Sequence, residues 1–179
     1  MRIEAYGIRE TIKRLEKEKE THAKLHEVME RLAKIGMNVA KYSFDRALYA
    51  GYNDVSVSFD WEADNRCVVK ASGTSVLFIE FGAGIRYGEH PQSSEFGFAH
   101  GTYGMGQGAN PQGWIYEGIP GSNPPADTDW VTGKNGDQKY SAKGEPLVRT
   151  KGNPPSMSMF TAGREMRDQA ERIIREVFR

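Results

Sequence analysis

The first residues that could do chemistry are two histidines in a highly charged stretch. His22 and His26 stand four residues apart, a spacing that places two imidazoles on one face of a helix, as a zinc pair requires. No Glu directly follows His22, so the HExxH pattern of hydrolytic zinc sites is absent, and no third ligand is evident. Histidines on a polar helix are usually solvated, and we therefore expect no metal here.

A second possibility is a hard-cation site in an acidic turn. Asp127, Asp129, Asn135 and Asp137 offer oxygen ligands at short spacing, the donor type that calcium takes. Their spacing does not match an EF-hand loop. The pattern therefore favours a solvated acidic turn.

A glycine-rich loop spans residues 104–108 and is superficially like a phosphate-binding loop. Such a loop needs a strand before it, a helix after it, and a lysine or a ribose-binding acid at a set distance. None of these is evident, and Asn110-Pro111 follows. We expect these glycines to give the backbone freedom to fit a neighbour. The chain is predicted not to be an enzyme and to use no cofactor. The alternative is a hydrolase or metal-binding enzyme with its site in residues 82–152.

Composition narrows the classes further. The 24 Lys and Arg balance the 24 Asp and Glu, which disfavours binding to DNA through many phosphates and suits association between subunits. Cys67 is the single cysteine, so no intramolecular disulfide is possible, and we expect it to be a small buried hydrophobe in a strand. No apolar run approaches the ~18 residues of a membrane span, and no signal-peptide core is evident, so we expect a soluble protein that contacts no membrane.

The first element that must position these residues is a long helix over residues 8–42. Its apolar stripe recurs at spacings of three, four or seven and comprises Ile8, Ile12, Leu15, His22, Met29, Ala33, Gly36 and Ala40. The first half is nearly all charge with a thin apolar seam. That half is either a projecting or interfacial helix or a solvated helix packed along its own domain.

Strands follow the helix. Alternation over residues 55–61 predicts a half-buried strand, residues 62–65 a turn, and residues 66–71 a returning strand. Residues 76–81 form a short apolar run that is either a buried strand or a short helix. Thr74 as a cap and Gly82 as a stop slightly favour the helix.

The composition changes sharply over residues 82–152, which hold 15 of the 20 glycines. Eight aromatic side chains are spread through this stretch, and large rings supply the burial that orders a chain. We therefore predict a long, partly ordered excursion with short strands near residues 114–116 and 146–150. The whole chain, 1–179, is expected to be a single domain with a long insertion at about 83–152.

A clear amphipathic helix closes the chain. Pro154 and Pro155 stop the preceding segment, and Ser156 or Ser158 is expected to cap the helix. Its predicted stripe comprises Met159, Phe160, Gly163, Met166, Ala170, Ile173, Ile174 and Val177. The fold class is α+β: a long N-terminal helix, a small antiparallel sheet, a short E-F-G segment, a long Gly/Pro/aromatic loop and a C-terminal helix.

Two segments carry a resemblance to a known family. Residues 76–84, Val-Leu-Phe-Ile-Glu-Phe-Gly-Ala-Gly, resemble the (Y/F)-(V/I)-E-(F/Y)-G-(T/A)-G segment of tail-completion, or head–tail joining, proteins of tailed phages. Residues 152–166 are similar to that family's G-x-P-(A/P)-x-x-(P/M)-(M/F)-x-x-A approach to a C-terminal amphipathic helix. The order of the elements also fits. The long insertion departs from the short members of the family.

The resemblance implies a structural subunit of the phage neck. Such a subunit would form a hexameric ring at the head-proximal end of the tail and join the tail to the head. Its partners would be the tail terminator or tail tube protein on one side and the head connector protein on the other. DNA would pass through the ring without specific binding. The protein would be located in the virion, assembled in the bacterial host cytoplasm.

Eight residues are expected to form subunit contacts: Glu80, Phe81, Gly82, Gly84, Tyr103, Trp114, Tyr116 and Trp130. Phe78 and Phe81 would anchor the short segment in the core, and the two glycines permit positive φ or close backbone approach. Glu80 lies inside an apolar run, so it either pairs with an Arg across a subunit boundary or is an exposed acid on the outer face.

Overall fold

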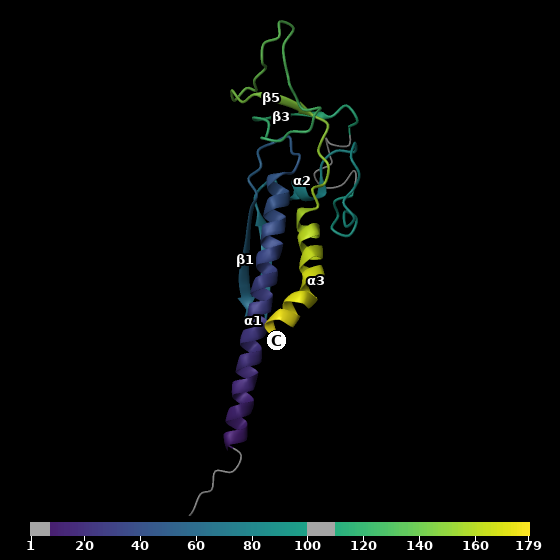
Figure 1. Cartoon of the computed structure of the whole chain (residues 1–179). Helices are drawn as coiled ribbons and strands as arrows, with labels where there is room; N and C mark the ends of the chain where they lie inside the picture. The colour runs from purple at the N-terminus through teal and green to yellow at the C-terminus, as the bar shows by residue number, and fades with distance from the viewer. Residues whose placement is uncertain (1–7, 100–109) are drawn as a thin grey trace, which may run out of the picture.

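A computed structural model describes residues 8–99 and 110–179, and the side chains from Lys13 onward within that range (Figure 1). The long helix α1 spans Ile8–Asp45, which confirms the predicted helix and extends it by three residues. Its second half buries Val28, Ala33, Ala40 and Phe44, at helical spacing. Residues 13–23 are exposed and project beyond the rest of the fold, as the first of the two alternatives predicted.

The hairpin of β1, Ser56–Ala63, and β2, Arg66–Ser72, runs along α1 and confirms the predicted strands and turn. Phe59 faces Val69 and Trp61 faces Cys67 across the antiparallel register. These alternate positions on β1 are half-buried, whereas the residues between them are exposed. Cys67 lies in a strand as expected but is only half-buried.

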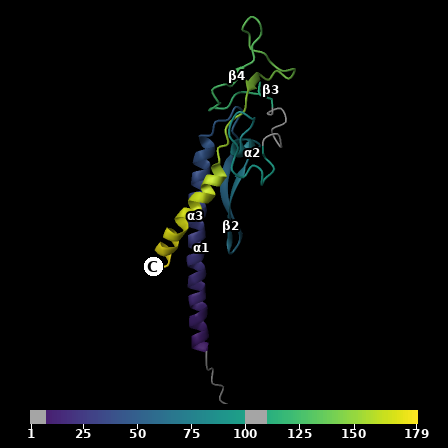
Figure 2. The same cartoon turned by 90° about the vertical axis from the view of Figure 1, so that its right-hand side faces the viewer.

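Helix α3, Ser158–Val177, packs along the second half of α1, while the hairpin lies on the other side of α1 (Figure 2). A side chain at Gly36 would overlap the sulfur of Met166, so this glycine allows the two helices to approach closely. Arg31 of α1 pairs with Glu176 of α3 at 2.5 Å. The predicted stripe is partly wrong: Ala162 is buried in place of the exposed Gly163, and Ile174 is 45% exposed.

Helix α2, Val76–Phe81, closes the core, so the helix interpretation of this segment is confirmed, with Gly82 at its C-terminal end. The central cluster is Ala40, Phe44, Ile79 and Ala162, one or two residues from each helix. Thr74 does not cap α2, and that prediction was wrong. The helix begins after Ser75, and both residues instead bond to the carboxylate of Asp54.

Above this body lies a second antiparallel sheet of three short strands in the order β3-β5-β4. The strands are β3, Trp114–Glu117, β4, Asp129–Trp130, and β5, Leu147–Thr150; the first and last confirm predicted strands, while β4 was not predicted. Residues 131–146 form an arm that projects from this sheet, held by isolated bridges such as Thr132 to Gln138. The fold is therefore α+β, with two small antiparallel sheets rather than the one expected.

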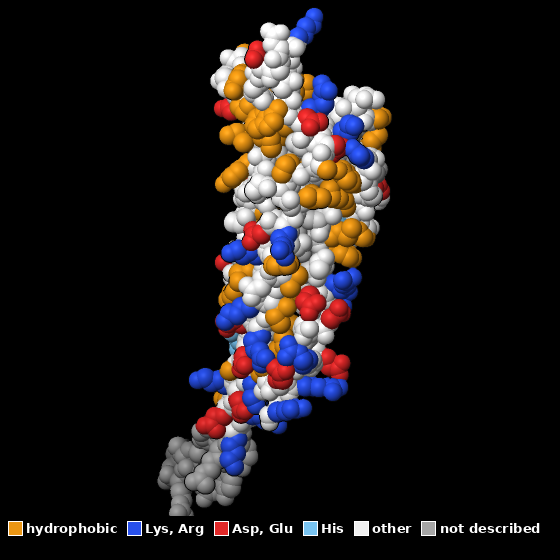
Figure 3. Space-filling model, turned by 45° about the horizontal axis from the view of Figure 1, so that its top comes forward, with side chains coloured by type: hydrophobic (Ala, Val, Ile, Leu, Met, Phe, Trp, Pro, Cys, Tyr) orange, Lys and Arg blue, Asp and Glu red, His pale blue; other side chains and the backbone are white. Residues whose placement is uncertain are grey.

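We call α1, the β1–β2 hairpin and α3 the stem, and residues 110–150 the head. Figure 3 shows hydrophobic side chains gathered over the head end and mixed charges over the stem. Large side chains exposed in or next to the head are Tyr52, Ile115, Ile119, Trp130 and Tyr140. No helix within the described residues is long and apolar enough to cross a bilayer.

Candidate functional site

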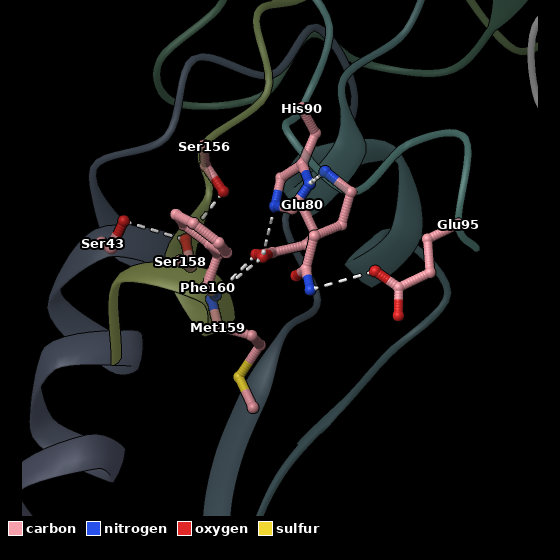
Figure 4. A network of polar contacts seen from close by, with 9 residues as sticks. Ser43, Glu80, His90, Glu95, Ser156, Ser158, Met159 and Phe160 are labelled. Atoms are coloured by element: carbon pink, nitrogen blue, oxygen red, sulfur yellow. Dashed lines mark hydrogen bonds and ion pairs between the residues drawn. The ribbon is translucent and has the colours of Figure 1, made fainter. Parts of the chain in front are cut away.

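A buried polar cluster lies where α2 ends and α3 begins. The side chain of Glu80 is buried, with the residue 5% exposed. Its carboxylate accepts hydrogen bonds from the backbone N–H of Met159 at 2.9 Å and of Phe160 at 3.1 Å (Figure 4). Glu80 is therefore not an exposed acid, and the partners it finds lie within its own chain.

Glu80 acts as a cap for α3 from another part of the chain. Met159 and Phe160 are the second and third residues of α3, and these N–H groups have no acceptor inside a helix. An N-cap side chain normally accepts from them, but the residue at that position is Met157, in the left-handed region with φ 53°. The prediction that Ser156 or Ser158 caps the helix was wrong. A carboxylate at this end also interacts favourably with the helix dipole.

His90 completes the buried cluster. It is 3% exposed, and its Nε2 lies 3.4 Å from a carboxylate oxygen of Glu80, a close polar contact that is not aligned as a hydrogen bond. Its Nδ1 accepts a hydrogen bond from the backbone N–H of Gln92 at 3.0 Å. A ring nitrogen that accepts carries no hydrogen, so the neutral imidazole has its hydrogen on Nε2, toward Glu80. Sequence reasoning missed His90, which stands without a motif in the Gly/Pro tract.

Aromatic rings connect residues 90–98 to this cluster. The ring of Phe81 stacks on Phe98 with centroids 4.4 Å apart and is tilted against His90 at 4.7 Å. Phe160 meets His90 edge-on, with ring centroids 5.4 Å apart. Phe81 is half-buried, as is Phe78, so neither is the fully buried core anchor that was expected; Ile79 takes that place.

The two segments that carry the family resemblance pack directly against each other here. Ala83 and Asn153 exchange two backbone hydrogen bonds of 3.1 and 3.0 Å. Gly82 and Gly84 both have φ 81°, and a Cβ would lie 2.8 Å from the nitrogen of Pro155 and 2.5 Å from the oxygen of Lys151, respectively. The expectation of positive φ and close backbone approach is confirmed at both glycines. We call this region, residues 80–84, His90 and residues 151–160, the joint.

Side-chain hydrogen bonds connect the start of α3 to the other two helices. Ser158 donates to Ser43 of α1 at 2.9 Å, and its oxygen lies 2.7 Å from that of Ser156. Asn153 donates through its side-chain amide to the carbonyl of Phe78 at 2.9 Å. The start of α3 is therefore fixed to both other helices.

The remaining predicted contact residues lie elsewhere. Trp114 and Tyr116 are half-buried in β3, and the hydroxyl of Tyr116 donates to the carbonyl of Ala50. Burial raises the pKa of Tyr116 to about 12. Trp130, in β4, is 46% exposed, and Tyr103 lies outside the described residues. The seven described residues thus divide between the joint and the head, and the use of all eight in subunit contacts stays a prediction.

The residues considered for metal binding are separated. His22 is exposed, whereas His26 stacks on Trp61 with ring centroids 3.7 Å apart. Asp127 is paired with Arg86. Within the described part of the chain, no three His, Cys, Asp or Glu side chains gather closely enough to hold a metal ion. The glycine-rich loop at 104–108 lies outside the described residues.

A cleft of about 460 Å³ opens beside the joint, between α2, α3 and the loop that contains His90. Its walls are mainly apolar and include Leu77, Phe96, Met159 and Phe160. Arg164 and Arg167 of α3 also line the cleft and are exposed. Comparison with known protein families, with curated proteins and with solved structures finds no match.

Proposed function

We propose that this chain is a structural subunit of a phage neck, which assembles into a ring, hexameric by the family resemblance, at the head-proximal end of the tail. In that position it joins the tail terminator or tail tube to the head connector in the virion. DNA passes through the ring without specific binding.

The observation that carries the proposal is the joint. The two segments that resemble tail-completion proteins, residues 76–84 and 152–166, lie far apart in the sequence. In the fold they form one unit, with glycines at the closest contacts and Glu80 capping the helix that the second segment begins. The two segments occur together in one chain because each needs the other: the E-F-G segment supplies the cap for the helix that the proline-containing segment begins.

The distribution of exposed side chains also supports assembly. Tyr52, Ile119 and Tyr140 are 80%, 68% and 60% exposed at or near the head. Large apolar side chains gathered on one end of a chain mark contact surfaces for other proteins. The projecting half of α1 adds a second surface on which Leu15 is 54% exposed.

The proposal is tested by measuring the mass of the purified chain in solution, alone and after mixing with purified tails. We expect a ring-sized oligomer, or a monomer that becomes stably bound at one end of the tail in electron micrographs. Tails prepared without the chain should join heads only after it is added. A chain that stays strictly monomeric and never binds a tail would refute the proposed function. Heat-unfolded chain serves as the control for unspecific restoration.

A further inference from the structure

Two arginines of α3 line the cleft beside the joint, and they differ from the other arginines of this helix in their ion pairing. Arg172 and Arg175 pair with Glu176 and Glu171 on the same helix. Arg164 and Arg167 make no ion pair with any described residue, although both are exposed at the cleft. An apolar cleft bordered by free guanidinium groups suits a ligand that combines a large apolar group with a carboxylate.

The head of the same chain presents such a combination. Trp130 is 46% exposed in β4, and the exposed Asp129 precedes it on the same strand. Asp129 makes no ion pair with a described residue, whereas nearby Asp127 is paired with Arg86. β4 is also an edge strand of its sheet, so one side of it is open to another chain.

We propose that the cleft binds the Asp129–Trp130 edge of a second copy of this chain. The indole ring would lie on Leu77, Phe96 and Phe160, and the Asp129 carboxylate would pair with Arg164 and Arg167. This inference rests on the proposed function and deepens it, because it names the contact through which the ring closes.

Three physical arguments favour this occupant. The charges are complementary, with two cations on one surface and an acid on the other, none of which has an ion-pair partner among the described residues. Tryptophan and arginine are the residue types that dominate binding energy at protein interfaces. The two surfaces are different parts of one chain. Such heterologous contacts generate a ring when the rotation between copies closes, whereas contacts between identical patches close a dimer.

The floor of the cleft adds a polar partner for the indole. An indole N–H can only donate a hydrogen bond, and the buried acceptor lining the cleft is the carboxylate of Glu80. That carboxylate already accepts two backbone N–H groups, and a carboxylate can accept more than two hydrogen bonds. Glu80 can therefore accept the indole N–H without releasing α3.

The experiment compares the self-association of four variants with the parent chain by sedimentation. Arg164→Glu with Arg167→Glu, and separately Trp130→Ala, should each weaken self-association roughly tenfold or more, the scale of an interface hot spot. The matched controls are Arg172→Glu with Arg175→Glu, which changes the charge of α3 equally away from the cleft, and Tyr42→Ala, which removes an exposed ring from α1. Both controls should associate like the parent.

A compensating charge exchange distinguishes the loss of this contact from a failure to fold. Adding Asp129→Arg to the Arg164→Glu, Arg167→Glu chain should restore association, because the attraction returns with its signs reversed. Self-association that is unchanged in every variant would overturn this contact and leave the ring itself intact. Variants that associate normally but fail to join tails would show that the cleft holds a different protein, which also overturns the assignment. A parent chain that associates with neither itself nor tails would refute the ring together with the contact.

Discussion

The stem and the joint are held together in different ways. In the stem, α1, α3 and the hairpin meet through side chains that repeat at helical or strand spacing, and each contact is one of many similar ones. In the joint, backbone meets backbone, and one carboxylate satisfies the start of a helix. The stem therefore has redundancy, whereas the joint depends on single residues. The substitutions below test that difference.

The largest effect is expected at Gly152. Its φ is 103°, a conformation that side chains rarely adopt, and a Cβ would overlap the carbonyl oxygen of Ala83. Both the N–H and the carbonyl of Ala83 are hydrogen-bonded to the backbone of Asn153, so Ala83 cannot move away alone. Gly152→Ala should lower the free energy of unfolding by about 3 kcal/mol or more, measured by urea denaturation.

Gly163 of α3 provides the matched control in the stem. It is helical, exposed, and a Cβ there would have open space around it. Gly163→Ala should therefore raise the free energy of unfolding by about 0.5–1 kcal/mol through helix propensity. A similar loss of stability in both glycine variants would contradict the contrast between stem and joint.

Glu80 should give the next largest effect. Glu80→Ala leaves the partly buried N–H groups of Met159 and Phe160 without an acceptor, and we expect a loss of about 2 kcal/mol in unfolding free energy. Glu80→Gln keeps an acceptor oxygen but removes the charge, so about 1 kcal/mol should be lost. Calorimetry or urea denaturation separates the two. If the two variants were equally destabilised, charge rather than capping would be the main contribution.

The sequence predicted the stem well because its physics is local. The apolar spacing of α1, the alternation of β1 and the amphipathic pattern of α3 each result from contacts that repeat every few residues. The one-residue error in the stripe of α3, Ala162 for Gly163, arose because periodicity does not specify which small residue faces α1.

The joint could not be predicted in the same way, because its contacts join residues far apart in the chain. Glu80 accepts hydrogen bonds from Met159 and Phe160, which follow it by 79 and 80 positions in the sequence, so no local capping pattern indicates this contact. Asp54 similarly holds Thr74 and Ser75, and His90 stands outside any motif. The resemblance singled out Glu80, Gly82 and Gly84, but the sequence left Glu80 either paired with an Arg of another subunit or exposed on the outer face, and neither alternative is the contact that Glu80 makes.

The start of α2 offers a smaller test of long-range anchoring. Asp54 accepts hydrogen bonds from the hydroxyl and backbone N–H groups of Ser75 and Thr74, which hold its pKa well below the ordinary value. A depressed pKa contributes stability above the unfolded value of about 3.9, and that contribution is lost as the pH falls further.

Asp54→Asn should therefore cost about 1 kcal/mol at pH 7, since Asp54 is partly solvated and its interactions are screened. The difference from the parent should shrink as the pH falls below about 4. Urea denaturation at pH 7 and pH 3 measures both. A difference that is constant with pH would show that the charge of Asp54 contributes nothing.

The smallest change in unfolding free energy is expected for a substitution in the projecting first half of α1. This half differs from the packed second half, so the comparison also applies within the stem. Leu15 is 54% exposed, whereas Val28 on the same helix is 5% exposed and faces the rest of the stem. Leu15→Ala should change the free energy of unfolding of the monomer by less than about 0.5 kcal/mol. Val28→Ala should lower it by about 2 kcal/mol, because a buried side chain loses its contacts and leaves a cavity.

A Leu15→Ala effect as large as that of Val28→Ala would mean that the first half of α1 is packed against protein in solution. If that effect grows with protein concentration, the packing partner is another copy of the chain.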